Sequence, residues 1–377
     1  MFRIALTSNT SFSLYNFRIG LMRRLKEYGF EVHTVAPEDE YSSLLKEEFF
    51  FHPLVHLDRK GTNPLKDALL FLEYLRLYKE IKPDLVINYT IKPNIYSSLS
   101  CGILKIPVIS VITGLGYVFI KGGFLRELVK ILYKLSFKFN RYTILLNKGD
   151  KEVIQSLVSK DRIILFDGEG VDTTKFNPEI CSSYKELDKV IFLYIGRFLK
   201  EKGLAELIQA CKLLHKKWKN FELWLLGSAD SGNPGSLTEE DIKEIQSYEF
   251  VKIFPFTKDV REYVCKADCV VLPSYGEGVP RALLEAMAME KPIITSDIPG
   301  CRELISNDNG FLVRPRDVED LYDKMNKFLE ISYEERAEMG RKGRELILKK
   351  YDERIIVEKY TKIIMDVLSA HRSKSST

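Results

Sequence analysis

Short apolar runs rich in Val, Ile and Leu recur along the chain, and a longer amphipathic stretch follows most of them. This alternation is typical of parallel sheets whose strands are connected by helical crossovers. The predicted strands are 2–7, 31–36, 84–88, 107–112, 142–146 and 162–166 in the first half, and 189–195, 221–226, 250–254, 268–272, 292–296 and 310–313 in the second. The predicted helices include 15–28, 125–140, 202–217, 258–266 and 280–289. The pattern predicts an α/β protein with two sets of strands.

A connector separates these two sets. The stretch 167–178 contains Gly168, Gly170 and Pro178 together with acidic residues, a composition typical of a linker. The length of 377 residues also favours two domains over one. We therefore predict two doubly wound sheets, one over 1–172 and one over 173–350, that face each other across a cleft. Ligands are expected at the carboxyl ends of the strands.

The composition is that of an ordinary globular protein, with 45% hydrophobic and 29% charged residues, and it argues against a disordered or fibrous chain. No segment approaches the roughly 20 consecutive apolar residues that span a bilayer. The six cysteines are scattered, so we interpret them as reduced thiols of a cytosolic protein. Cys265 and Cys269 have no His beside them, which favours packing over a metal site.

The strand 189–195 is followed by the first candidate for chemistry. It ends in Gly196 and Arg197, and Lys202 opens the next helix. A glycine at the end of a strand lets the backbone approach a ligand, while arginine and lysine supply a fork and a point charge for phosphate oxygens. This arrangement fits a diphosphate, although basic residues near a helix start are also common on solvated surfaces.

A second motif, Pro273–Ala286, gives a stronger signal. Pro280 suits the first position of a helix, so the free amides near Val279 would point out of the helix N-terminus and can receive an anion. Glu277 lies in the loop before this helix, and Glu285 lies on its first turns among apolar residues. The alternative is that Glu277 only favours the helix dipole and that Glu285 is a surface residue. An unpartnered carboxylate in an apolar setting is costly, however, which favours a role for Glu285.

The spacing of Glu277 and Glu285 with Gly278 and Pro280, preceded by Gly196-Arg197 and Lys202-Gly203, resembles the donor-site signature of the family-four retaining glycosyltransferases. The resemblance covers essentially the whole chain. It implies the GT-B fold, with two Rossmann-like domains across a cleft. It also implies that the final helix, 351–370, crosses back onto the first domain.

The resemblance implies roles for particular residues. Glu277, Arg197 and Lys202 would be catalytic, with the two cations on the donor diphosphate and Glu277 on the donor sugar. Glu285 would bind the ribose of a UDP-sugar, which is a substrate, and no metal or other cofactor is expected. The remaining donor-binding residues would be Gly196, Phe254, Pro255, Phe256, Gly278, Val279, Pro280, Thr113 and Gly114. Many relatives carry a His near the donor sugar, and the segment Ile112–Phe119 has none. Retention would then proceed by front-face attack, with the departing phosphate accepting the proton.

Polar residues of the first half suggest an acceptor site. They follow two predicted strands whose carboxyl ends lie at one edge of the sheet. Arg18, Lys92 and Asn94 suit an acceptor that bears phosphate, and Asn9 and Asn16 lie in the same loops.

Charge is concentrated in residues 101–150, which hold eight basic and two acidic residues although the whole chain has a net charge of only +4. Within this segment Arg126, Lys130, Lys134 and Lys138 recur every four residues on a predicted helix, and its apolar residues lie mainly elsewhere. Such a helix binds an anionic membrane surface or, more commonly, is a solvated face over a buried one. Nucleic acid is a less favoured partner because no nucleic-acid module accompanies the basic cluster.

Within the family, the loops around Arg18, Lys92, Gly114 and the basic helix are similar to one branch. Its members transfer N-acetylgalactosamine from UDP to a bacillosamine on undecaprenyl diphosphate during bacterial protein N-glycosylation. This resemblance implies a peripheral protein at the cytoplasmic face of the inner membrane. The alternative is a related transferase that uses another UDP-sugar and a capsular or O-antigen lipid-linked acceptor. A two-domain dehydrogenase is disfavoured because the first strand and helix lack the Gly-x-Gly-x-x-Gly fingerprint.

Overall fold

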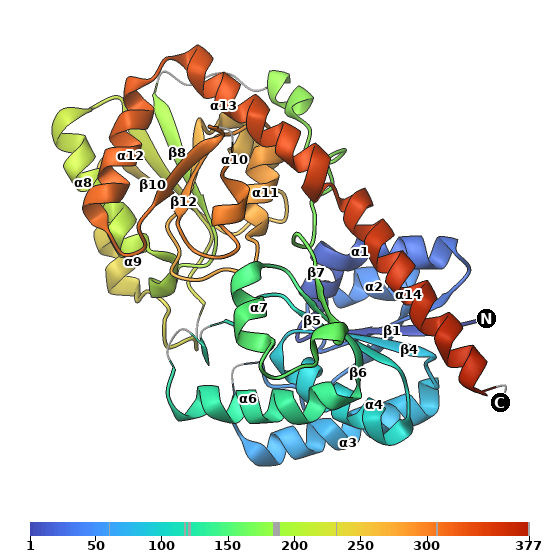
Figure 1. Ribbon diagram of the computed structural model, residues 1–377. Coiled ribbons are helices and arrows are strands. Elements are labelled where there is room, and N and C mark those ends of the chain that lie inside the picture. The colour runs from blue at the N-terminus through green and yellow to red at the C-terminus, as the bar shows by residue number, and fades with distance from the viewer. Residues whose placement is uncertain are drawn as a thin grey trace. The chain divides into compact units, whose positions relative to one another are not determined.

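The computed structural model describes residues 1–59, 61–116, 118–119, 122–183, 189–230, 232–306 and 308–375. The chain forms two compact units (Figure 1). The first contains Met1–Glu169 and Glu353–Thr377, and the second contains Gly170–Asp352.

The first unit is built on a seven-stranded parallel sheet with the order β3-β2-β1-β4-β5-β6-β7. Its strands are β1 (Arg3–Thr7), β2 (Glu31–Ala36), β3 (Phe50–Pro53), β4 (Leu85–Tyr89), β5 (Val108–Ile112), β6 (Asn140–Leu145) and β7 (Ile163–Leu165). The central strands β4 and β5 are buried throughout, which explains their unbroken apolar patterns. The sequence predicted every strand except β3, an edge strand whose Phe50 is exposed.

Helices cover this sheet. They are α1 (Ser11–Glu27), α2 (Ser42–Glu48), α3 (Pro64–Ile81), α4 (Ser98–Leu104), α6 (Phe124–Ser136), α7 (Lys148–Ile154) and α14 (Glu353–Ser375), with the short turns η1 (Pro93–Ser97), η2 (Phe137–Phe139) and η3 (Lys160–Arg162). The predicted helix 15–28 begins earlier, at Ser11, because the Thr10 hydroxyl accepts a hydrogen bond from the Ser13 amide at 3.1 Å and caps it. Helices α3 and α4 pack on the face of the sheet that carries Ala5, Val35 and Val86.

The second unit repeats the doubly wound plan with six parallel strands in the order β10-β9-β8-β11-β12-β13. These strands are β8 (Val190–Ile195), β9 (Phe221–Leu226), β10 (Val251–Phe254), β11 (Cys269–Leu272), β12 (Ile293–Ser296) and β13 (Gly310–Val313). The helices are α8 (Leu204–Lys217), α9 (Glu239–Gln246), α10 (Arg261–Lys266), α11 (Arg281–Ala288), α12 (Val318–Glu330) and α13 (Tyr333–Leu346), with the turns η4 (Pro178–Ser183), η5 (Lys200–Lys202), η6 (Arg302–Leu304) and η7 (Ile347–Tyr351). The two doubly wound parallel sheets confirm the predicted fold class.

The unit boundaries differ from those drawn on the sequence. Gly170, Val171 and Asp172 belong to the second unit, not the first. The reason is local pairing, since Val171 forms an isolated parallel bridge with Asp352 and the Thr173 hydroxyl donates to the Asp352 carboxylate at 2.6 Å. Tyr351 and Asp352 are likewise part of the second unit, and the returning helix α14 begins at Glu353 and packs on α1.

A disulfide joins Cys181 in η4 to Cys265 in α10, across a sequence separation of 84 residues. The prediction that all six cysteines are reduced thiols is therefore wrong for this pair. The other four, Cys101, Cys211, Cys269 and Cys301, are free and buried. Spacing along the chain gave no indication of the pair, because η4 and α10 meet only in the folded unit.

Candidate functional site

The predicted donor-site residues follow neighbouring strands of the second sheet. Gly196 and Arg197 come after β8, the Phe254 segment ends β10, and the Glu277 loop comes after β11. In the strand order, β9 and β10 lie on one side of β8, and β11, β12 and β13 lie on the other. Successive strands are thus added outward in opposite directions from β8 and from β11. The gap between β8 and β11 is thus a topological switch point, where ligands of such sheets bind at the carboxyl ends.

Two glycines hold the loops of this edge against each other. Gly203, at a φ of +72°, precedes α8, and a Cβ there would overlap the Pro273 carbonyl at the start of the loop after β11. Gly300, at a φ of +86°, leaves no room for a Cβ beside the Gly278 carbonyl. Only glycine fits both the backbone conformation and the close approach. The Lys202 turn and the Glu277 loop are therefore fixed in contact.

The charged residues at this edge form two ion pairs. Lys202 Nζ contacts Glu277 Oε1, and the side chains are 18% and 12% exposed. Arg197 Nη1 lies 2.5 Å from Asp230 Oδ2, with the guanidinium half exposed. Sequence reasoning missed Asp230, although its place shortly after β9, at the same sheet edge, was a usable signal. Both predicted phosphate-binding cations are thus brought to one edge, and each is paired with a carboxylate.

Glu285 lies on α11, one turn after Arg281, and the two side chains form an ion pair with Nε to Oε1 at 3.1 Å. Burial raises the pKa of the Glu285 carboxyl above its usual value, and the neighbouring Arg281 charge opposes that shift. Pro280, which is buried and extended, is the cap of this helix rather than its first residue. The prediction that Glu285 occupies the first turns of a helix among apolar neighbours is confirmed.

Tyr275 links the Glu277 loop to α8, a role that the sequence did not indicate. Its hydroxyl donates to Glu206 Oε1 at 2.6 Å, and its amide donates to the Glu201 carbonyl at 2.9 Å. The guanidinium of Arg316 lies 4.5 Å from the centre of its ring. Burial, followed by the hydrogen bond to Glu206, raises the pKa of the Tyr275 hydroxyl. These contacts fix the loop that carries Glu277.

The Phe254 segment is less available than predicted. The Phe254 carbonyl accepts a hydrogen bond from the Gly227 amide at 3.0 Å, so it is already used by the sheet edge. The Phe254 ring packs against Trp224 and Tyr263, with both centroid distances at 5.0 Å. Pro255 and Phe256 are exposed. Binding of a base by the Phe254–Phe256 segment stays a prediction.

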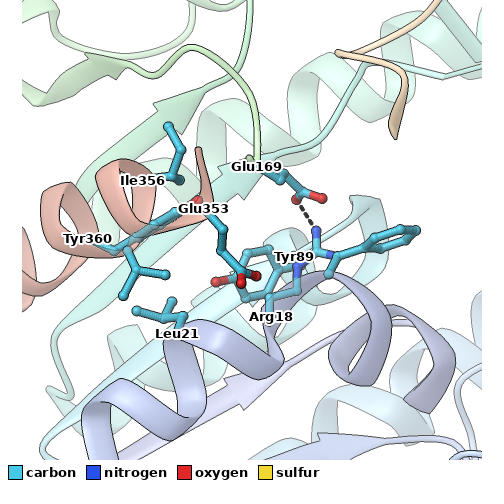
Figure 2. Close-up of a pocket in the computed structure, with 9 residues that line it drawn as sticks. Arg18, Leu21, Tyr89, Glu169, Glu353, Ile356 and Tyr360 are labelled. Carbon is cyan, nitrogen blue, oxygen red and sulfur yellow. Dashed lines mark hydrogen bonds and ion pairs between the residues drawn. The ribbon is translucent and has the colours of Figure 1, made fainter. Parts of the chain in front are cut away.

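Arg18, predicted to contact an acceptor, is buried inside the first unit, and its acceptor role stays a prediction. Its Nη2 contacts Glu169 Oε1, its Nη1 donates to the Ser13 carbonyl at 2.9 Å, and its guanidinium lies 4.3 Å from the centre of the Tyr89 ring. Figure 2 shows Arg18 beside Tyr89, with the dashed contact to Glu169 and with Tyr360 and Glu353 of α14 nearby. Aromatic rings and a partner carboxylate thus occupy the surface of the guanidinium that was assigned to phosphate.

Lys92 and Asn94 also contact other residues of the first unit. Lys92 Nζ donates to Asp67 Oδ1 at 2.6 Å in a largely buried pair, and Tyr96 donates to the other oxygen of Asp67 at 2.9 Å. Asn94 is fully buried, and its amide donates to the Val111 carbonyl at 2.9 Å. Within the described residues Lys92 is paired with Asp67, whereas Asn94 Oδ1 is buried with no hydrogen-bond partner, so their acceptor role stays a prediction.

The other predicted residues of the first unit lie in partly exposed positions. Asn9 follows β1, and Asn16 on α1 donates to the Phe12 carbonyl one turn earlier at 3.1 Å. Thr113 and Gly114 follow β5, and Gly114 has a φ of +127°. All four stay available to a ligand at the carboxyl edge of the first sheet.

Helix α6 carries three of the four predicted basic residues, Lys138 follows in η2, and Lys134 and Lys138 are exposed. Its apolar residues are arranged differently from expectation. Val129 and Tyr133 are buried, but Phe124, Leu128, Ile131 and Leu135 are exposed. At helical spacing these four form one outward stripe, and the basic residues lie along its flank. The interpretation as a solvated polar face over a buried apolar face is therefore wrong.

No helix in the described ranges is long and apolar enough to cross a membrane. Within the same ranges, no cluster of three or more His, Cys, Asp or Glu side chains is placed to hold a metal ion.

Comparisons with known proteins match both halves of the chain. Residues 178–346 match the family "Glycosyl transferases group 1", and residues 3–147 match "Glycosyl transferase 4-like". The N,N'-diacetylbacillosaminyl-diphospho-undecaprenol alpha-1,3-N-acetylgalactosaminyltransferase of Campylobacter jejuni is 31% identical, over 96% of this chain and 98% of that protein. The capsular polysaccharide biosynthesis glycosyltransferase CapM of Staphylococcus aureus is 26% identical over 90% of each.

Solved structures agree at the level of the fold. Anabaena HepE in complex with UDP-glucose superposes with a TM-score of 0.80 over 97% of this chain and 100% of that chain, at 16% identity. At this identity the likeness extends to the arrangement of the elements and not to individual side chains.

Proposed function

This chain belongs to the family-four glycosyltransferases of the GT-B fold, and from that premise we propose that it transfers N-acetylgalactosamine from UDP to a sugar linked to undecaprenyl diphosphate. The 31% identity to a relative with that named activity, over nearly the full length of both chains, supports this donor and acceptor. The role in glycan assembly for protein glycosylation is part of the same proposal. The 26% identity to a capsular glycosyltransferase supports the alternative, another UDP-sugar on a capsular lipid-linked acceptor.

The observation that carries the proposal is the pair of cations at the β8–β11 switch point. In the proposed donor complex, diphosphate oxygens replace Glu277 on Lys202 and Asp230 on Arg197. Glu277, released from Lys202, then accepts a hydrogen bond from a hydroxyl of the donor sugar. Glu285 accepts hydrogen bonds from the ribose hydroxyls. Because both cations are already held at one edge, little reorganisation is needed when the ligand binds.

The proposed chemistry is a front-face transfer with retention. As the bond between the sugar and the diphosphate breaks, negative charge grows on the leaving oxygen, and Arg197 and Lys202 stabilise it. The acceptor hydroxyl attacks on the same face and gives its proton to the departing phosphate. Two fixed cations supply the charge stabilisation that a divalent metal supplies elsewhere, so we propose that the reaction needs no added metal.

The proposal is tested by measuring transfer from radiolabelled UDP-N-acetylgalactosamine, alongside a panel of other UDP-sugars, to undecaprenyl-diphosphate acceptors. Lys202→Ala should lower kcat/KM by about a hundredfold or more, because it removes a group that stabilises transition-state charge. Glu277→Gln should lower kcat/KM by about ten- to a hundredfold, because it removes a charged hydrogen bond to the donor sugar that contributes about 1.5–3 kcal/mol. Lys200→Ala is the matched control, because Lys200 lies in the same turn but is exposed. Wild-type turnover in either site variant would refute the site. Preference for another UDP-sugar would favour the capsular alternative.

A further inference from the structure

Nine large apolar side chains of the first unit are exposed on adjoining elements. Leu65, Leu69 and Leu72 lie on α3, Ile103 on α4, Phe124, Leu128, Ile131 and Leu135 on α6, and Phe139 on η2. We call these nine residues the apolar face. On α3 the three leucines point away from the core, since they lie opposite the buried Leu70 and Tyr74 at helical spacing.

The elements that carry the apolar face are packed together. The Phe139 ring of η2 lies directly against Gly102 of α4, next to Ile103. On the other side, the Ser100 hydroxyl of α4 donates to the Phe71 carbonyl of α3 at 3.2 Å, next to Leu72. Helices α3 and α6 both pack against η1, and they run alongside each other in Figure 1. The exposed residues of α3 and α6 are therefore joined through α4 and η2 into one surface.

Such a surface requires a partner. Contiguous apolar patches of this kind are rare on monomeric soluble proteins and mark sites of contact with proteins or membranes. We propose that the apolar face inserts into the outer part of an anionic lipid bilayer, with α3 contributing as well as α6. This inference rests on the proposed lipid-linked acceptor and adds the mode of membrane contact, which is insertion of apolar side chains and not charge attraction alone.

The charges around the apolar face select lipid over a second copy of the chain. Arg126, Lys130, Lys134 and Lys138 flank the α6 stripe, and the one acidic residue of α6, Glu127, is paired with Arg126 at 2.9 Å and Lys130 at 3.2 Å. Two copies that met through this face would bring like charges together. Anionic headgroups would instead neutralise them while the acyl chains cover the apolar side chains.

The test uses the full-length protein and sedimentation with vesicles of phosphatidylcholine and phosphatidylglycerol. Leu69→Gln and Leu72→Gln should each weaken binding by about tenfold or more, because each removes one buried leucine side chain from the lipid contact and about 1.4 kcal/mol is a factor of ten. Leu348→Gln is the control, since Leu348 is an exposed leucine of the second unit. Turnover with a water-soluble acceptor should stay at the wild-type level in all three variants.

Three results would overturn the insertion. The first is unchanged vesicle binding by the α3 variants. The second is complete release of the wild-type protein by 1 M salt, which screens charges but leaves apolar contacts in place. The third is a dimer in solution that the α3 variants convert to monomers without affecting vesicle binding. Quenching of a tryptophan placed by Leu72→Trp with brominated acyl chains would support insertion directly. If the wild-type protein showed no turnover with the soluble acceptor, that result would instead contradict the proposed function.

Discussion

The disulfide between Cys181 and Cys265 makes the stability of the second unit depend on the redox state of the solution. It closes a loop with a sequence separation of 84 residues. The loop-entropy relation assigns about 4.5 kcal/mol at 25 °C to a loop of that length. For a unit of this size about 1 kcal/mol moves the melting temperature by roughly 2–4 °C. Reduction should therefore lower the melting temperature of the second unit by roughly 9–18 °C.

The measurement is thermal unfolding of the full-length protein by circular dichroism, with and without a reductant. The variant Cys181→Ser/Cys265→Ser is the matched control and should melt at the lower temperature under both conditions. Titration of the denatured, unreduced wild-type protein with a thiol reagent should give the four free cysteines. Equal melting temperatures with and without reductant, or six titratable thiols, would refute the reasoning.

Two further predictions concern buried charges. Glu285→Gln should raise the KM for the UDP-sugar by about ten- to a hundredfold, because a hydrogen bond to a charged group contributes about 1.5–3 kcal/mol. Burial raises the pKa of Glu285 in the folded protein, so the wild-type protein loses stability as the pH rises from the ordinary carboxyl pKa through the raised one. Urea denaturation at several pH values should show that Glu285→Gln lacks this pH-dependent loss. Arg18→Leu should cost about 3–5 kcal/mol of stability, because it leaves the partly buried Glu169 without this partner, while the KM for the lipid acceptor stays constant. A raised acceptor KM with unchanged stability would support the acceptor role of Arg18.

The strands and the donor edge could be predicted because their signals are local. A central parallel strand is apolar on both faces, so β4, β5, β8 and β11 are readable as short apolar runs. Polar residues directly after such strands must lie at the carboxyl edge of the sheet, which places Arg197 and Glu277 together without further information. The edge strand β3 was missed because one side of it is exposed and the apolar signal is weak.

The contacts of the proposed acceptor residues could not be predicted, because these contacts are made with partners far away in the sequence. Arg18 is neutralised by Glu169, 151 residues later, and Lys92 by Asp67, which lies on a helix that was not predicted. The same limit applies to α6. Helical periodicity separates an apolar stripe from a basic one, but it does not say which stripe the rest of the unit covers.

The two units share one architecture but use its carboxyl edge differently. At the β8–β11 switch point the polar residues are charged and partly exposed, as in the Lys202–Glu277 pair. At the matching β1–β4 point of the first unit, the described residues form a buried neutral network in which Thr7 contacts Tyr74 at 3.2 Å and Asn88 donates to Ser98 at 2.9 Å. A diphosphate needs fixed cations, and the second edge offers them. In the first unit the basic residues Arg126, Lys130 and Lys134 lie on α6, beside the apolar face. The proposed donor recognition and the proposed membrane contact therefore involve residues of different units, so variants of each should separate donor KM from vesicle binding.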